Sequence, residues 1–362
     1  MSEHTLQVLP HENSRRTRVV RLAPALGAAI LLGFAVYASR ATVSPASTIS
    51  AAVDDDKTTA TAAAKANAFL ESLDAQLRSK ALLEYDSAKK SSWSNLPVTM
   101  VARNGVRLGE LTKAQRAAAL DAIAAVLSKQ GFQKVIDIIN ADDQLVTGKE
   151  NKMRFGGDNF YLAFFGKPSP TQPWMLQFGG HHLGINVTVV GKNSVLTPTH
   201  TGAQPTSFTR GGKTVRPLGP ENDLAFKLVN DLDAKQQKQA VLGAKPKNLV
   251  LGPGQDGKTI QPEGIKGSAL TEAQRGTLLE LIGAWVHMLP EDAAATCLAS
   301  FKAKLADTYF VWYGPTTDGS AAYYRIQGPT LVIEYAPQGG TNHIHTIFRD
   351  PSNDYGAQLT KQ

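Results

Sequence analysis

The strongest constraint on the fold of this chain is an internal repeat. Residues 73–75 (LDA) recur at 232–234, and residues 111–116 (LTKAQR) recur as LTEAQR at 270–275, both at an offset of 159 residues. Farther along, FYLAFFG, which ends at Gly166, aligns with TYFVWYG, which ends at Gly314, at an offset of 148. Offsets held over more than a hundred residues indicate an internal duplication.

The repeat predicts the domain organisation of the chain. We expect copy one at 63–205, a connector at 206–219, copy two at 220–356 and a short tail at 357–362. The copies either share one core as a pseudo-twofold pair or form two separate domains on a linker.

Each copy has the residue pattern of helices followed by strands. Thr112 and Thr271 are typical helix N-caps, each followed by apolar residues at helical spacing, and a second helix is predicted at 134–144 and at 292–307. Aromatic and β-branched runs with a period of two then predict three antiparallel strands per copy, in a meander. The predicted fold class is therefore α+β.

The N-terminus predicts export. Four arginines between Arg15 and Arg21 precede a chargeless apolar run, Leu22 to Ala38, so residues 1–41 have the layout of an export signal or an uncleaved membrane anchor. SRRTRVV at 14–20 also fits a twin-arginine signal, with the general secretory route as the alternative. Residues 42–62 are rich in Ala, Ser, Thr and Asp and predict a flexible spacer before a periplasmic or extracellular protein.

Charge and cysteine content limit the partners. The net charge is +7, and loss of residues 1–38 would remove four arginines and two glutamates and leave +5, without a basic run after the signal. A nucleic-acid role has no support, and membrane contact is expected only through an uncleaved signal. Cys297 is the only cysteine, so no intrachain disulfide, cysteine-based zinc site or lipid-anchoring cysteine is available.

The stretch LVLGPGQDGKT at 249–259 matches the phosphate loop of nucleotide-binding proteins. Such a loop requires a helix directly after its Lys-Thr pair, and Pro262, Gly264 and Gly267 make a helix improbable there. We therefore expect a surface loop and no nucleotide.

Histidines give the better functional indication. His181 and His182 are adjacent in one predicted strand, with His182 and Asn186 on its more exposed face, and His343 and His345 would share one face of another strand. The repeat places Pro329 and Thr330 opposite the first pair, and Val195 and Thr197 opposite the second. Each copy thus has the histidines that the other lacks, which predicts one composite site between the copies.

Nearby polar residues could complete this site. Glu334 and Asp350 are candidate metal ligands beside the four histidines, whereas Arg349, Asp354 and Asn186 are candidates for substrate binding and catalysis. His200 is a weaker candidate and His287 is expected on a helix. The alternative is a structural hydrogen-bond network in strands and turns.

Several of these segments resemble a known family. SSWSNLP at 91–97, LTKAQR, FGGHHLGINVTVV at 178–190 and HIHTIFRDPSNDYG at 343–356 are together similar to the exported family catalogued as domain of unknown function 3500. The resemblance covers about residues 66–356 and implies no reaction. It marks the following motif positions: His181, His182, Asn186, His343, His345, Arg349, Asp350, Asp354 and Tyr355.

Two functions follow as hypotheses. The first is an exported enzyme that depends on a divalent metal, Zn, Fe or Cu, and acts on a small molecule. The second is a non-catalytic protein that binds a small ligand in an aromatic cleft lined by Trp174, Trp312, Tyr323 and Tyr324. A purely structural exported scaffold is the third possibility, and the oligomeric state is open.

Overall fold

The computed structural model describes residues 58–361, so the expected export signal and residues 42–57 of the expected spacer lie outside the described residues. Helix α1 (Thr59–Ser72) begins inside the stretch predicted to be a spacer, because the Thr58 hydroxyl caps it by accepting a hydrogen bond from the Thr61 N–H. Between residues 58 and 361, no helix is both long and apolar enough to cross a membrane.

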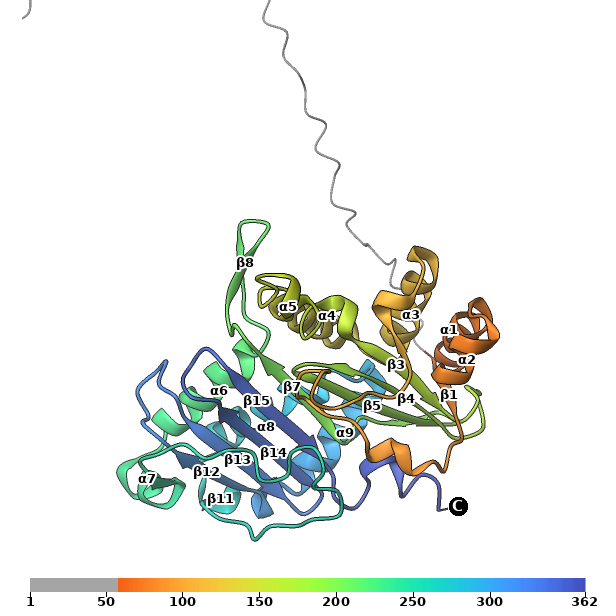
Figure 1. The fold of residues 1–362 in the computed structure, drawn as a ribbon. Helices are drawn as coiled ribbons and strands as arrows, with labels where there is room; N and C mark the ends of the chain where they lie inside the picture. Colours follow the sequence, from red (N-terminus) through yellow and green to blue (C-terminus); the bar gives the residue numbers. More distant parts are fainter. Residues whose placement is uncertain (1–57, 362) are drawn as a thin grey trace, which may run out of the picture. The chain divides into compact units, whose positions relative to one another are not determined.

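One mixed sheet of thirteen strands organises the described chain (Figure 1). Its main path runs in the order β1-β3-β4-β5-β7-β15-β14-β13-β12-β10, with β2, β6 and β11 attached to β3, β5 and β12. The strands are β1 (Leu82–Leu83), β2 (Val106–Arg107), β3 (Tyr161–Phe165), β4 (Trp174–Gly180), β5 (Leu183–Val190), β6 (Asn193–Val195), β7 (Thr199–Ala203), β10 (Val241–Gly243), β11 (Ile265–Lys266), β12 (Tyr309–Tyr313), β13 (Tyr323–Gly328), β14 (Leu331–Pro337) and β15 (Ile344–Arg349).

The helices match the predicted pattern in both parts of the chain. Besides α1, they are α2 (Ala75–Ala81), α3 (Lys113–Val126), α4 (Lys129–Asp143), α5 (Lys149–Lys152), α6 (Gly219–Asn230), α7 (Ala234–Ala240), α8 (Glu272–Val286) and α9 (Glu291–Ala303). Thr112 and Thr271 are N-caps as predicted, and each forms a capping box with the glutamine three residues later. The α+β class and the antiparallel meanders β3-β4-β5 and β12-β13-β14 are confirmed.

Residues 58–205, here the first half, contribute seven strands to the sheet, and residues 219–361, the second half, contribute six. β1 is parallel to β3 as β10 is parallel to β12, and β7 of the first half lies antiparallel to β15 of the second half. The register is also equivalent, since Gln177 pairs with Asn186 on β4 and β5 as Arg325 pairs with Glu334 on β13 and β14. A single hydrophobic cluster continues through both halves, so they form one folded unit rather than two domains on a linker.

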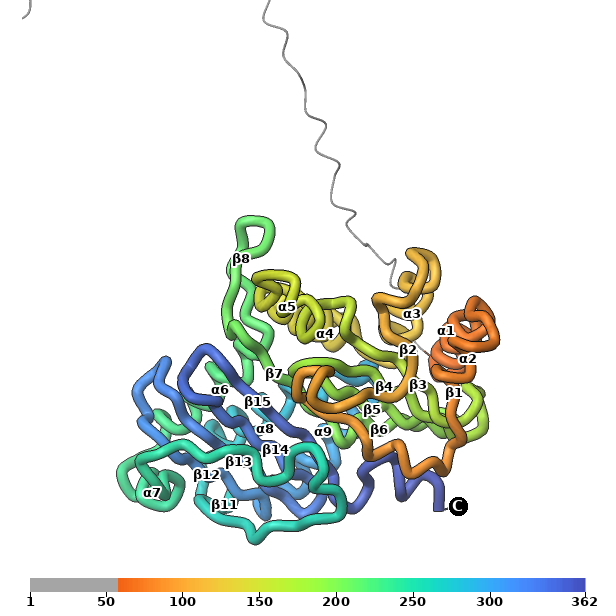
Figure 2. The backbone as a smooth tube through the Cα atoms, viewed as in Figure 1, coloured from red at the N-terminus to blue at the C-terminus, as the bar shows by residue number. Residues whose placement is uncertain are grey.

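The two faces of the sheet differ because neighbouring residues of a strand point to opposite sides. One face is apolar and is covered by helices: Phe69 of α1 packs against Phe164, and Trp285 of α8 donates a hydrogen bond to the Thr346 hydroxyl. The other face is polar and is covered by two long loops, residues 84–105 and 244–264, which cross the strands in front in Figure 2. Loop carbonyls accept hydrogen bonds from some buried polar side chains of this face: Lys90 from Gln177, and Gln261 from Arg325.

The connector predicted at 206–219 contains a separate hairpin of β8 (Phe208–Arg210) and β9 (Lys213–Val215). Another expectation, the aromatic cleft, is wrong. The four aromatic side chains expected to line a ligand cleft are fully buried among the strands and helices: Trp174, Trp312, Tyr323 and Tyr324. An aromatic cleft is therefore not available to a ligand.

Candidate metal centre

His181 and His182 lie in the two-residue turn that joins β4 to β5, whereas the sequence predicted them in a strand. His182 has a φ of 63°, in the left-handed region that a non-glycine residue adopts only when its surroundings compel it. Its backbone N–H donates to the Asn95 carbonyl at 3.1 Å, and its side chain lies close to Gly202 of β7, where a Cβ would come within 3.3 Å of the ring. The ring is buried, against the expectation of exposure.

His343 and His345 are on the strand at the middle of the sheet. His345 is in β15 and His343 directly precedes it, and both side chains lie on the same face, as predicted; this is the polar face of the sheet. The Nε2 atoms of these two rings are 3.0 Å apart, and the Nε2 of His182 lies 2.7 Å from that of His343.

These residues form what we call the three-histidine cluster: His182, His343 and His345. Their ligand atoms all lie within 4.8 Å of one another, and they could hold a metal ion. Imidazole nitrogens bound to a tetrahedral zinc at its usual bond length would be about 3.3 Å apart, close to the observed separations. Residues 161 positions apart in the sequence, His182 and His343, thus converge at the junction of the two halves, where β7 meets β15.

A carboxylate supports the cluster from behind. The His181 ring packs against the His182 ring at a tilt of 32° with 3.6 Å between centroids, and its Nδ1 is 2.6 Å from a carboxylate oxygen of Asp142. Asp142 is buried at the end of α4, and its other oxygen accepts the Gly156 N–H. Asp142, His181 and His182 also form a group that could hold a metal ion, and Asp142 fixes the orientation of the imidazole beside the cluster.

Asn95 connects both histidine segments to the loop at 84–105. Besides receiving the His182 N–H, it places its side-chain amide 3.2 Å from Nδ1 of His345. The amide atom nearest this ring is Nδ2, which donates to Nδ1. A free Nε2 lone pair for a metal requires the flipped amide, in which the oxygen accepts the Nδ1 proton.

His200 lies under the cluster on β7. Its ring is 5.3 Å from that of His345, it is fully buried, and neither of its ring nitrogens has a hydrogen-bond partner. Burial and then the neighbouring His345 lower its pKa well below the usual value. The ring is therefore neutral at pH 7 and adds no positive charge that would repel a metal ion.

The cluster itself is also neutral at physiological pH. Burial, followed by the nearby imidazoles, lowers the pKa of His343 to about 4 and that of His345 to about 3, and it lowers the pKa of His182 well below its usual value. Neutral imidazoles are the form that binds metal ions.

These depressed pKa values predict that the metal-free protein loses stability in acid. Histidines in the unfolded chain bind protons near pH 6.5, whereas His343 and His345 resist protonation to about pH 4 and 3, so the unfolded state gains protons first as the pH falls. We expect the free energy of unfolding to fall by about 2 kcal/mol between about pH 7.5 and pH 5, allowing for solvent screening. Urea denaturation in the presence of a chelator measures it. A smaller decrease is expected for the double variant His343→Gln/His345→Gln, and an equal decrease would contradict the assignment to these residues.

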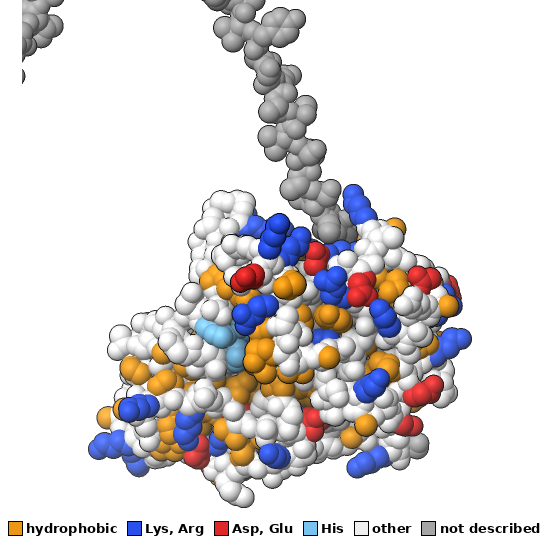
Figure 3. All heavy atoms as spheres, in the orientation of Figure 1, with side chains coloured by type: hydrophobic (Ala, Val, Ile, Leu, Met, Phe, Trp, Pro, Cys, Tyr) orange, Lys and Arg blue, Asp and Glu red, His pale blue; other side chains and the backbone are white. Residues whose placement is uncertain are grey.

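The cluster opens to the surface. In Figure 3, histidine side chains are visible in a hollow of the loop-covered face, with hydrophobic side chains beside them and Lys and Arg side chains above. The half-buried rings of His343 and His345 are reached from this hollow, whereas the His182 ring is buried behind them.

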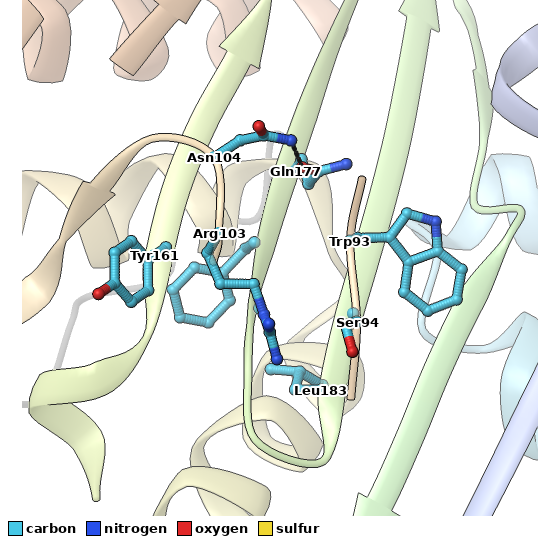
Figure 4. Close-up of a pocket in the computed structure, with 10 residues that line it drawn as sticks. Trp93, Ser94, Arg103, Asn104, Tyr161, Gln177 and Leu183 are labelled. Carbon is cyan, nitrogen blue, oxygen red and sulfur yellow. Dashed lines mark hydrogen bonds between the residues drawn. The ribbon is translucent and has the colours of Figure 1, made fainter. Parts of the chain in front are cut away.

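A second hollow beside this region is small. It lies between β4, β5 and the loop at 84–105, where Figure 4 shows Trp93, Ser94 and Arg103 around the end of the hairpin, and it has room for about one water molecule. Arg103 donates to the Gly180 carbonyl at 3.1 Å, one residue before His181, and Trp93 covers Gly184. These contacts hold the histidine turn in place and do not form a substrate pocket.

Two carboxylates that the sequence suggested as ligands are engaged elsewhere. Glu334 is fully buried and accepts the N–H groups of Val250 and Leu251 and the Tyr323 hydroxyl at 2.7–2.8 Å. Asp350 accepts the N–H and hydroxyl of Ser352 in a turn. Neither belongs to the groups of side chains that could hold a metal ion in the described part of the chain.

The residues suggested for catalysis also lie away from the histidines. Asn186 is fully buried, not exposed as expected, and bridges Gln177 and the Pro198 carbonyl. Arg349 donates to the carbonyls of Leu251 and Gly252 and to the carboxylates of Asp256 and Asp354.

The glycine-rich stretch at 249–259 is thus part of the loop that covers the polar face of the sheet. Thr259 is followed by loop residues and then by strand β11, and no helix begins at the Lys-Thr pair. Arg349 and Glu334 hold residues 250–256 from below, and Tyr355, with a φ of 58°, donates to Asp256 and accepts from the Trp93 indole. Arg349, Asp354 and Tyr355 therefore anchor the two loops that cover the sheet.

Sequence reasoning missed three residues that position the cluster: Asp142, Asn95 and Arg103. The signal for Asn95 was present, since it lies in the SSWSNLP motif, but its role depends on a loop folding back over a hairpin. Asp142 is one of two consecutive aspartates at the end of a helix, a pattern that is too common to identify a site.

These features define a mixed α+β protein with one large sheet and a histidine cluster that could hold a metal ion at its centre. The chain belongs to the family described as protein of unknown function (DUF3500), whose model matches residues 55–357, as the sequence motifs suggested. No curated protein and no solved structure matches the chain.

Proposed function

We propose that this protein is a metal-dependent enzyme whose ion is bound by His182, His343 and His345 and whose remaining coordination position faces the solvent. The observation that carries the proposal is the convergence of the three Nε2 atoms, with 2.7 and 3.0 Å between neighbours. Three protein ligands with an open position are typical of catalytic sites, whereas structural zinc sites use four. An ion bound in this way lowers the pKa of a coordinated water or polarises a substrate oxygen.

The chain's own residues support this use. Asp142 orients His181 against His182, and Asn95 holds His345 by its other ring nitrogen, so two of the three ligands are fixed by neighbouring groups. An all-imidazole set suits Zn, Fe and Cu, so the choice among these ions, and between hydrolysis and oxidation, is a matter for measurement.

Metal analysis of the purified protein tests the proposal. The protein is prepared without metal-affinity resin and analysed by mass spectrometry for metals. We expect about one ion per chain, and more than a tenfold loss of bound metal in the double variant His343→Ala/His345→Ala, because two of three ligands are removed. His287→Ala is the matched control, since this exposed histidine ends α8 outside the cluster.

Two results would contradict the proposal. A folded, metal-free protein that takes up no Zn, Fe or Cu on addition would leave the histidines as a structural network. Equal metal loss in His287→Ala would show adventitious surface binding.

We infer further that the fold arose by duplication, with a pseudo-twofold axis between β7 and β15. The two constant sequence offsets, 159 and then 148, the matching registers of β4-β5 and β13-β14, and the symmetric strand order support this inference. A glycine with positive φ stands at the same repeat position in each half, Gly105 and Gly264, and at each a Cβ would lie within 2.2 Å of a carbonyl oxygen of the neighbouring strand. Residues 1–205 and 206–362, expressed as separate chains, should reassemble into a metal-binding protein, and failure of both pieces to associate would count against equivalent halves.

We also propose export, on the basis of the arginines and the apolar run within residues 1–38. N-terminal sequencing of the protein from the native cell, together with fractionation, distinguishes a cleaved signal from an anchor; a cytoplasmic protein that retains Met1 would refute export.

A further inference from the structure

Five large hydrophobic side chains stand out as exposed in residues 58–361. They are Leu96, Met100, Met153, Leu242 and Val250, with 40–67% of their surface exposed. Three of them lie on the two segments that border the three-histidine cluster. Single exposed hydrophobic residues are normal on a protein surface, whereas a group of them beside a candidate metal site indicates a ligand-binding surface.

The first segment is the part of the loop between Asn95 and Arg103. Asn95 contacts both His182 and His345, and Arg103 ties the Leu96 carbonyl to the Gly180 carbonyl just before the histidine turn. These bonds hold Leu96 beside the histidine turn, and Met100 follows four residues later in the same loop. Figure 3 shows hydrophobic side chains next to the pale blue histidine surface. Met100 is 62% exposed, so its flexible thioether side chain is available to a ligand.

The second segment runs from α5 to Phe155 and approaches the cluster through His181, which packs against His182. The Phe155 ring lies 4.8 Å from the His181 ring, and the Arg154 guanidinium is 5.3 Å from the Phe155 centroid. Met153, the most exposed of the five at 67%, adjoins them.

This segment also carries uncompensated positive charge. Residues 149–154 contain Lys149, Lys152 and Arg154 against Glu150 alone, and none of the three cations forms an ion pair with any residue that the structure describes. Lys and Arg side chains are visible above the histidines in Figure 3. A free guanidinium beside apolar side chains favours a ligand that has both an anionic group and an apolar body.

We propose that the three-histidine cluster acts on small organic anions with an apolar or aromatic body, which Leu96, Met100 and Met153 contact and whose charged group Arg154 binds. This inference rests on the proposed function, because it names the substrate class of the same metal site.

Two fluorescent probes of nearly equal shape test the proposal. 1-Anilinonaphthalene-8-sulfonate has an aromatic body and a sulfonate, and N-phenyl-1-naphthylamine has the same body without the charge. Both are titrated into the metal-loaded full chain, and all variants carry the same N-terminal residues, so binding to those residues cancels in the comparison.

We expect saturable binding of the sulfonate at one site per chain. Met100→Ser/Met153→Ser should weaken both probes about tenfold, because two apolar contacts are lost. Arg154→Gln should weaken the sulfonate about threefold and leave the uncharged probe unchanged. Leu242→Ser is the matched control: Leu242 is 45% exposed but lies on β10 at the far end of the sheet, and its loss should change neither affinity.

Equal effects of Leu242→Ser and the double methionine variant would overturn the proposal, as would an Arg154→Gln effect of the same size on both probes. The metal content of each sample is also measured, because it distinguishes a wrong substrate class from a protein that binds no metal. A metal-loaded protein whose probe binding ignores Met100, Met153 and Arg154 refutes the substrate class alone. Residue-dependent probe binding by a protein that binds no metal refutes the enzyme and leaves an anion-binding site.

Discussion

Arg349→Met should lower the free energy of unfolding by about 3 kcal/mol, because it leaves two carboxylates without their cation in a largely buried position. The Arg349 side chain is 1% exposed, and it pairs with Asp354 at 2.7 Å and with Asp256 at 2.8 Å. It also donates to two carbonyls of the glycine-rich loop. Urea denaturation at pH 7, followed by tryptophan fluorescence, measures the change.

The matched control is Arg216→Met. Arg216 makes an equally short pair with Asp223 at 2.7 Å, but both side chains are about half exposed, so a loss below about 1 kcal/mol is expected.

The outcome also decides between two roles for Arg349. As an anchor of the loops it affects stability and leaves metal content unchanged in the folded protein. An Arg349→Met protein of normal stability that has lost ligand binding would instead restore the interpretation of Arg349 as a substrate-binding residue.

The fold was largely predictable from the sequence because its signals are local. Capping threonines and helical apolar spacing located α3 and α8, and the alternation of aromatic and β-branched residues located both meanders. The predicted spacer extends wrongly into the first residues of α1. Residues Thr59 to Ala62 are small and have no apolar period, but Thr58 caps this helix, which packs on α3.

The site was predictable only in part. His343 and His345 are two residues apart at the start of β15, so their proximity followed from the strand period. The approach of His182 followed from the complementary positions in the repeat. Turn geometry could not be predicted, since a histidine with positive φ is rare, and so His182 was wrongly placed in a strand.

The carboxylates show most clearly which part of the site could not be predicted from the sequence. Glu334 and Asp350 are near the histidines in sequence. Side chains on one face of a sheet can nevertheless have different partners, and the Glu334 carboxylate accepts hydrogen bonds from N–H groups of the loop at 244–264. Asp142, which does contact a histidine, is about forty residues away on a helix. Proximity in sequence was therefore a poor guide to which acids approach the cluster.

Lys134→Met should destabilise the protein by about 3–5 kcal/mol, because it isolates a fully buried carboxylate at the junction of the halves. Lys134 of α4 forms an ion pair with Glu221 of α6 and also donates to the Ala284 carbonyl at the end of α8. One Glu221 oxygen already has no partner, so removal of the lysine leaves the whole group unsatisfied.

A double variant separates the net contribution of the ion pair to the free energy of unfolding from the destabilisation caused by removing only one partner. Lys134→Met/Glu221→Leu should recover most of the lost stability, since two apolar side chains of similar volume replace the buried charges. Lys227→Met is the surface control, because Lys227 and Asp231 are both about half exposed, and we expect less than about 1 kcal/mol. Recovery would mean that the ion pair specifies how α4 and α6 meet and contributes little net stability; a double variant as unstable as the single one would mean that the halves need this ion pair to pack.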